Sequence, residues 1–134
     1  MSDFDDLLRL DRSEHAEQND ALIGITALPG VFAYRQNTGT AWQGRPVHAP
    51  PGEYVKITPG MKVLADARPI DFGLKGAGDI VGQKRGRAFQ VEMKTTHGVH
   101  KKHQEAFGRI WTQKGGIYIL ARSADEAVKR VNEI

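Results

Sequence analysis

The sequence predicts an α/β domain in which helices flank a small mixed β-sheet. Three observations indicate this class. Apolar residues recur at helical spacing near both ends of the chain, short segments rich in β-formers lie between them, and glycine or proline residues separate the segments. The order helix, strands, helix, strand, helix is typical of one layered α/β sandwich. A chain of 134 residues has room for one core, so we expect a single domain over residues 1–134.

The first predicted elements are a helix and a strand. Ser13 is a suitable N-cap, Glu14 and Glu17 follow in the first turn, and Pro29-Gly30 ends the helix. Residues 31–36 alternate and are rich in β-formers, which predicts a strand. The apolar face of the helix comprises Ala21, Leu22, Ile25 and Leu28, and an earlier turn with Phe4, Leu7 and Leu8 is expected to pack on it.

The middle of the chain predicts loops and short strands. Residues 39–61 contain four prolines, which indicates a loop with one short strand at residues 54–57. A second short strand is expected at residues 61–65. Residues 73–78, rich in glycine, are interpreted as a flexible approach to Asp79.

The second half of the chain predicts a hairpin and two helices. Residues 79–82 and 88–93 read as strands joined by a short turn, and residues 95–100 as a loop. A helix ending at Gly115-Gly116 is followed by a strand at residues 117–121. Ser123 with Glu126 forms a capping box that begins the last helix. The inner faces of the two helices comprise His103, Phe107, Ile110 and Trp111, and then Ala124, Ala127, Val128 and Val131.

Composition excludes several classes of protein. The sequence has no cysteine, so any metal would be held by oxygen or imidazole ligands. It has no apolar run long enough to cross a membrane and begins with an acidic stretch unlike a secretory signal, so we expect a cytoplasmic protein. Residues 1–20 hold seven acids and two arginines, a net charge of −5. Because the whole chain carries +3, the remainder carries +8, which suits a polyanionic partner such as nucleic acid.

The sharpest chemical signal is an acid cluster at the predicted hairpin. If Gln83 pairs with Ala88, Asp79 falls opposite Glu92, with Cβ atoms about 4.5–5.5 Å apart. Alternation places Phe89, Val91 and Met93 toward the core, and Gln90, Glu92 and Lys94 on the polar face. Two opposed carboxylates repel each other, and a divalent cation such as Mg²⁺ would offset that repulsion.

Lys94 completes a set of groups suited to phosphodiester cleavage. A metal ion polarises the phosphate and acidifies a water, and an ammonium neutralises charge that develops on the phosphorus oxygens. Gly76 and Gly78 would let a phosphate approach Asp79 closely. The alternative is that Glu92 and Lys94 form only a surface salt bridge.

These residues, in this order, resemble the virus-type replication-repair nuclease (VRR-NUC) family, whose members have the PD-(D/E)XK (restriction-endonuclease-like) fold. The resemblance covers residues 13 to about 127, and the small size is similar to that of stand-alone phage and bacterial members. The proline-rich residues 45–60 have no place in the family pattern. The motifs that carry the resemblance are Ser13-Glu14 with Gln18, residues 35–39 and 72–82, Val91-Glu92-Met93-Lys94-Thr95, Gln104 with Phe107, and Gly115-Gly116.

The resemblance implies a DNA endonuclease that uses Mg²⁺ or Mn²⁺. It implies that Asp79, Glu92 and the Met93 carbonyl bind the metal and that Lys94 is catalytic. Glu14 would be a further acid near the metal, with Glu17 as a rival, and Gln104 would support the site. It also implies a homodimer acting on branched DNA such as Holliday junctions, in replication, recombination or repair within a bacterial or phage-infected cell.

Several side chains outside this cluster are candidates for DNA contact. Trp42, in a predicted loop, could stack on an unpaired base or lie in a subunit interface. His97, His100 and His103 invite a zinc hypothesis, but they suit a basic rim better. The alternatives to a structure-specific nuclease are a non-catalytic nucleic-acid-binding module with the same fold and a sequence-specific or RNA-directed nuclease. The predicted DNA-contacting residues are Arg35, Asn37, Lys75, Lys84, Arg85, Arg87, Lys101 and Lys102.

Overall fold

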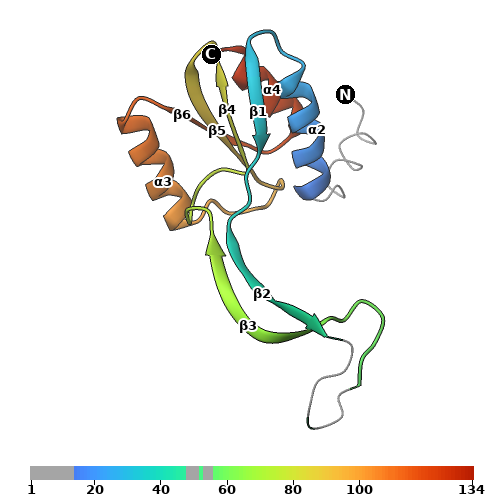
Figure 1. The fold of residues 1–134 in the computed structure, drawn as a ribbon. Helices are drawn as coiled ribbons and strands as arrows, with labels where there is room; N and C mark the ends of the chain where they lie inside the picture. Colours follow the sequence, from blue (N-terminus) through green and yellow to red (C-terminus); the bar gives the residue numbers. More distant parts are fainter. Residues whose placement is uncertain (1–13, 48–51, 53–55) are drawn as a thin grey trace. The chain divides into compact units, whose positions relative to one another are not determined.

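The computed structural model describes residues 14–47, 52 and 56–134. The predicted features that lie outside these ranges are Ser13, the turn with Phe4, Leu7 and Leu8, and residues 54–55 of the strand predicted at 54–57. No helix in the described ranges is long and apolar enough to cross a membrane. The elements are α2 (Glu14–Thr26), β1 (Val31–Arg35), β2 (Gly39–Val47), β3 (Val63–Phe72), β4 (Ile80–Lys84), β5 (Arg87–Met93), α3 (Lys102–Gln113), β6 (Ile117–Ala121) and α4 (Ala124–Asn132) (Figure 1).

The chain forms two compact units. The first comprises residues 1–37 and 74–134 and contains a four-stranded sheet in the order β1-β4-β5-β6. The second comprises residues 38–73 and contains the two-stranded sheet of β2 and β3. No described residue of the second unit is buried, so the hydrophobic core lies in the first unit.

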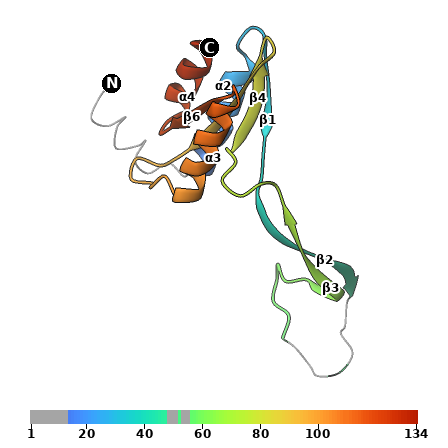
Figure 2. The ribbon, with the colours of Figure 1, turned by 90° about the vertical axis from the view of Figure 1, so that its left-hand side faces the viewer.

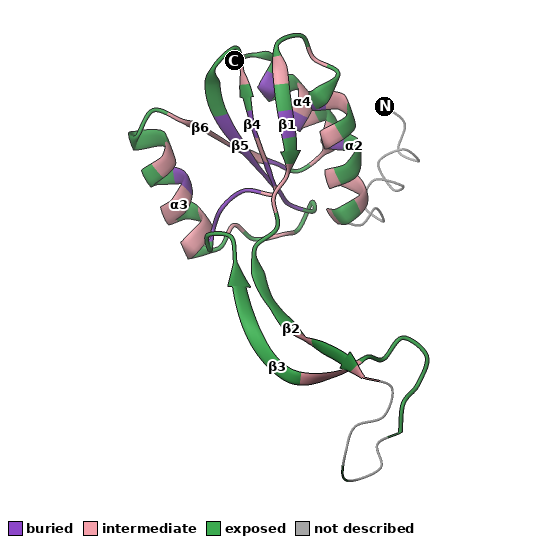
Figure 3. Cartoon of the chain, in the orientation of Figure 1, coloured by how far each residue is buried: buried purple, intermediate pink, exposed green. Residues whose placement is uncertain are grey.

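The four-stranded sheet is mixed, as predicted. β4 is antiparallel to both β1 and β5, whereas β5 and β6 are parallel. Alternate residues of β5 face opposite sides of the sheet. Phe89, Val91 and Met93 join the core with α2 and α4, and α3 covers the other side (Figure 2). The central strand β5 is therefore buried on both faces (Figure 3).

The positions of the helices and the cap of α4 agree with the sequence. The buried residues of α2 are Ala21 and Ile25, both on the predicted apolar face. Ser123 Oγ accepts a hydrogen bond from the Glu126 amide at 3.1 Å, as expected for the cap of α4. The prediction that Ile110 faces inward is wrong, since 54 % of this residue is exposed. Ile110 lies at the flank of the apolar stripe of α3 rather than at its centre.

The prediction of a loop at residues 39–61 is wrong for residues 39–47, which form the strand β2. β2 pairs with β3 along most of its length, with an irregularity between Gln43 and Arg45. β3 is also much longer than the strand predicted at residues 61–65. Pro46 and Pro69 are tolerated because each strand of a two-stranded sheet has a free edge that needs no amide donor. Residues 56–57, the described part of the strand predicted at 54–57, are not in a strand.

Candidate active site

Asp79 lies directly before β4 and is fixed through its backbone and its side chain. Its carbonyl accepts a hydrogen bond from the Gln36 amide at 2.8 Å. Its Oδ2 accepts a hydrogen bond from the Met93 amide at 2.7 Å, which ties the carboxylate to the end of β5. The register of β4 and β5 pairs Gln83 with Ala88, as the sequence predicted, and its continuation sets Asp79 opposite Glu92.

Glu92 and Lys94 are buried, although the sequence placed them on the polar side of the strand. Their exposed fractions are 2 % and 8 %, because α3 covers this side of β5. Lys94 Nζ lies 3.1 Å from Glu92 Oε1. A surface salt bridge therefore does not describe this pair.

Gln104 links α3 to the acid cluster. In the first turn of α3, its Nε2 donates to Glu92 Oε1 at 2.5 Å and its Oε1 accepts from the Lys101 amide at 3.0 Å. The start of α3 thus holds both Gln104 and the Glu92 carboxylate in place. The resemblance to the VRR-NUC family had implied that Gln104 would support the site.

Both carboxyl groups are destabilised in their charged form. Burial, reinforced by the charge of Asp79, raises the pKa of Glu92 to about 7. Burial also raises the pKa of Asp79, and the Met93 amide and Lys94 oppose this shift in part. The charge of Glu14 acts in the raising direction on both pKa values, so Glu14 is electrostatically coupled to the pair.

Two features of the pair of Asp79 and Glu92 fit the binding of a divalent cation: an oxygen without a partner in the described part of the chain and a nearby carbonyl. Glu92 Oε2 is buried and accepts no hydrogen bond from the described residues, although a buried carboxylate oxygen normally has a partner. Met93 donates its amide toward Asp79, and the N–H and C=O of one strand residue point to the same neighbouring strand. The Met93 carbonyl is therefore directed toward the side on which Asp79 lies.

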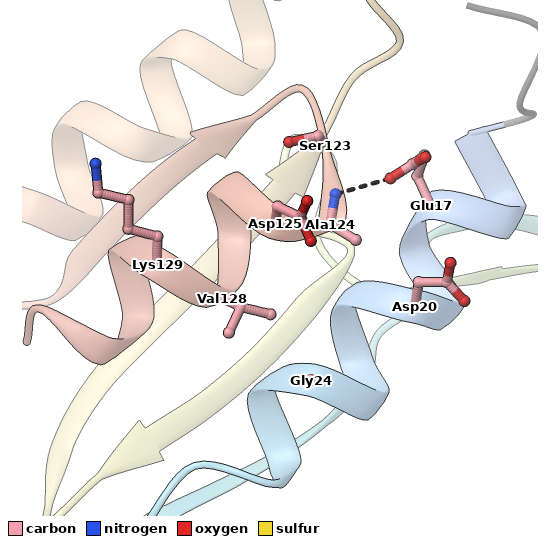
Figure 4. Close-up of a pocket in the computed structure, with 8 residues that line it drawn as sticks. All are labelled: Glu17, Asp20, Gly24, Ser123, Ala124, Asp125, Val128 and Lys129. Atoms are coloured by element: carbon pink, nitrogen blue, oxygen red, sulfur yellow. Dashed lines mark hydrogen bonds between the residues drawn. The ribbon is translucent and has the colours of Figure 1, made fainter. Parts of the chain in front are cut away.

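Glu14 does not complete a three-carboxylate group. Within the described ranges, no three His, Asp or Glu side chains gather as a metal site. Glu14 Oε1 accepts a hydrogen bond from Gln18 at 3.4 Å. Its rival, Glu17, is engaged elsewhere: it accepts a hydrogen bond from the Ala124 amide at 2.7 Å, at the start of α4 (Figure 4). The geometry therefore favours Glu14 as the acid nearer the pair.

The glycine turn before Asp79 packs against protein, which corrects two expectations. Gly76, Ala77 and Gly78 are buried rather than a flexible approach. A Cβ at Gly76 would collide with the His103 carbonyl at the start of α3, and one at Gly78 would lie 2.9 Å from the Val91 carbonyl. The glycines are thus required for close packing of backbone on backbone, and phosphate access does not explain them.

The predicted DNA-contacting residues divide into two groups. Lys75, Lys101 and Lys102 are exposed near the segments that hold Asp79 and Gln104, and Asn37 is exposed after β1. Arg35 donates to Asn19 at 2.8 Å, and its charge lowers the Asp79 pKa slightly. Lys84, Arg85 and Arg87 lie at the far end of β4 and β5, about 16 Å along the strands from Asp79. Lys84 donates to the Asn132 carbonyl at 2.8 Å, so it stabilises the end of α4.

Two side chains near the pair, Gln90 and Tyr118, were given no functional role by sequence reasoning. Gln90 Oε1 accepts from the Gly78 amide at 2.8 Å, and alternation along β5 could have indicated it. Tyr118, opposite Gln90 on β6, approaches His100 Nε2 at 3.3 Å. Burial, with the charges of Glu92 and Asp79, raises the Tyr118 pKa, which places its hydroxyl near the acids. His100 therefore contacts Tyr118, and it joins no zinc site within the described ranges.

The fold and the site define an α/β protein with a buried carboxylate–lysine cluster at the end of a central strand. The sequence matches no protein-family model and no curated protein.

Proposed function

We propose that this protein is a metal-dependent endodeoxyribonuclease of the VRR-NUC family with the PD-(D/E)XK fold. The observation that carries the proposal is the meeting of Asp79, Glu92 and Lys94 where β4 begins and β5 ends. These are the residues of the motif that gives the fold its name. A mixed sheet with helices on both faces is compatible with that fold.

Asp79, Glu92 and the Met93 carbonyl would hold Mg²⁺ or Mn²⁺. The free Glu92 Oε2 and the raised pKa values of both carboxyl groups support this assignment, because a dication favours the ionised form of each. Glu14 would contribute its charge from α2, through water. The chemistry that the dication supplies when bound is polarisation of the phosphate and a more acidic water.

Lys94 would act on the phosphate and on the attacking water. Its ammonium is buried beside Glu92, so its charge is only weakly screened by solvent. It can orient the water through a hydrogen bond and neutralise the charge that builds on the phosphorus oxygens. Gln104 holds the Glu92 oxygen that faces Lys94 and so fixes the distance between these two groups.

The substrate would be branched DNA rather than a particular sequence. Lysine and arginine side chains read the backbone and shape of DNA, and the exposed cations near the site are of this kind. A homodimer would bring together two sites related by a two-fold axis, which suits paired cuts in a four-way junction.

The test is a cleavage assay with linear duplex, flap, four-way junction and RNA substrates, each with Mg²⁺, Mn²⁺ or EDTA. Wild-type protein should cut branched DNA only with a dication. Lys94→Met should lower kcat by at least about 100-fold. Lys129→Met, which removes an exposed lysine on α4, should leave kcat unchanged.

Two results would overturn the proposal. Undiminished cleavage by Lys94→Met would show that the cluster is not the catalytic site. DNA binding without cleavage under any dication would instead indicate a nucleic-acid-binding module with this fold.

A further inference from the structure

The solvent-facing side of α3 carries an aligned set of polar side chains that the site does not use. Lys102, Arg109 and Gln113 are exposed and follow the spacing i, i+7, i+11. At 100° per residue, they lie within about 40° of one another around the helix axis. Gln104 and Gly108 lie on the opposite side of α3, where they contact Glu92 and the Tyr118 ring.

The cations on this face are free. In the described part of the chain, the side chains of Lys102 and Arg109 make no hydrogen bond or ion pair. Arg35, Lys84 and Arg122, by contrast, each donate to other protein groups. A free cation on a rigid helix is available to an external anion without the loss of an internal contact.

The balance of charge along α3 favours an anionic partner. The exposed cations, counted from the residue before the helix to the residue after it, are Lys101, Lys102, Arg109 and Lys114. Glu105 is the one acid within α3. An excess of one sign along a helix favours association with a polyanion and disfavours an apolar or basic protein surface.

The spacing of the cations suits a DNA strand. Lys102 and Arg109 are seven residues apart, which is about 10 Å along the helix. Phosphates recur every 3.4 Å of axis along one DNA strand, so this separation spans about three steps. The whole of α3, about 18 Å long, spans about five.

We propose that the outer face of α3, through Lys102 and Arg109, binds the phosphate backbone of duplex DNA. This inference deepens the proposed function, since it names the surface that would hold the duplex beside the acid cluster. The first turn of the same helix contacts Glu92 through Gln104, so the phosphate-binding face begins within one turn of the site. The contact is to the backbone and carries no sequence preference.

The experiment measures DNA affinity of the whole protein at several NaCl concentrations in EDTA, where no cleavage occurs. The logarithm of the affinity falls linearly with the logarithm of salt, with a slope of about 0.9 per neutralised phosphate. Arg109→Ala should reduce the slope by about 0.9, and the Lys102→Ala, Arg109→Ala double variant by about 1.8. Arg109→Lys should keep the wild-type slope, because a backbone phosphate requires only a cation.

Two controls make the result specific. Lys129→Ala removes an exposed lysine from α4 on the opposite side of the sheet and should not change the slope. Glu105→Gln removes the acid from α3 and should raise the affinity. The proposal is overturned by an unchanged slope in Arg109→Ala, by an equal loss in Lys129→Ala, or by tighter binding of duplex RNA than of DNA of the same sequence.

Failure of this inference and failure of the nuclease proposal are distinguishable. Salt-dependent binding lost in the α3 variants, without cleavage by wild type, would support the surface and remove the nuclease. Metal-dependent cleavage by the wild type, with unchanged DNA affinity in the α3 variants, would support the nuclease proposal and overturn the proposed DNA-binding surface on α3.

Discussion

Glu92 is the residue whose surroundings decide the chemistry of the site. It is 2 % exposed, one of its oxygens has no partner among the described residues, and Asp79 repels it. The folded pKa of about 7 exceeds the ordinary value of 4.5, so the folded state binds this proton more tightly than the unfolded chain does. The contribution to stability is therefore full below pH 4.5 and is lost as the pH rises through 7.

This pH dependence should disappear in Glu92→Gln. Between pH 5 and pH 8 without metal, the free energy of unfolding of the wild type should fall relative to that of Glu92→Gln by about 2 kcal/mol. Urea unfolding at the two pH values measures the difference. A difference that stays constant, or one that grows with the opposite sign, would contradict the assigned burial of the carboxyl group.

At the scale of elements, the glycine turn and α3 act on the site together. Gly76 has a φ of +94°. It lies against the backbone of His103 in α3, and His103 directly precedes Gln104. Gly86 has a similar φ of +88°, but a Cβ there would meet nothing within 4 Å. A comparison of substitutions at Gly76 and Gly86 therefore distinguishes the cost of backbone strain from the cost of steric contact.

Gly76→Ala should cost more stability than Gly86→Ala. We expect about 1 kcal/mol for Gly86→Ala, from its left-handed backbone alone, and about 3 kcal/mol for Gly76→Ala, which must also displace the start of α3. Thermal unfolding of both variants measures this. Equal costs would show that α3 does not pack on the turn as described.

The sequence could predict some of the elements that form the site but not the contacts between them. The hairpin register followed from the turn length, so the opposition of Asp79 and Glu92 was accessible from sequence. Burial of Glu92 was not, because it depends on α3 covering the polar side of β5, which is a tertiary contact. The strand β2 was missed because Pro46, together with the prolines that follow it in the sequence, indicates a loop unless the strand has a free edge.

At the scale of the whole molecule, the described residues of the second unit contribute nothing to the hydrophobic core. This unit has no buried residue within its described part, and its two-stranded sheet begins and ends at paired residues, Gly39 and Phe72. Opposed residues in an antiparallel pair have Cα atoms about 4.5–5.5 Å apart. A short turn can therefore bridge the two ends.

Replacement of residues 40–71 by Asn-Gly should leave the first unit folded. The core is untouched and the dipeptide suits a two-residue turn, so the free energy of unfolding should change by no more than about 1 kcal/mol. Circular dichroism during thermal unfolding measures this. Loss of the cooperative transition would show that the second unit is required for folding of the first.

The central claim is that the buried carboxylate pair binds a dication, and the most direct measurement is Mn²⁺ titration followed by electron paramagnetic resonance at pH 8. Wild-type protein should bind Mn²⁺ at one site, and Glu92→Gln should bind it at least about tenfold more weakly. Glu133→Gln removes an exposed acid at the end of α4 and should bind as the wild type does. Equal affinity in the wild type and Glu92→Gln would contradict the account.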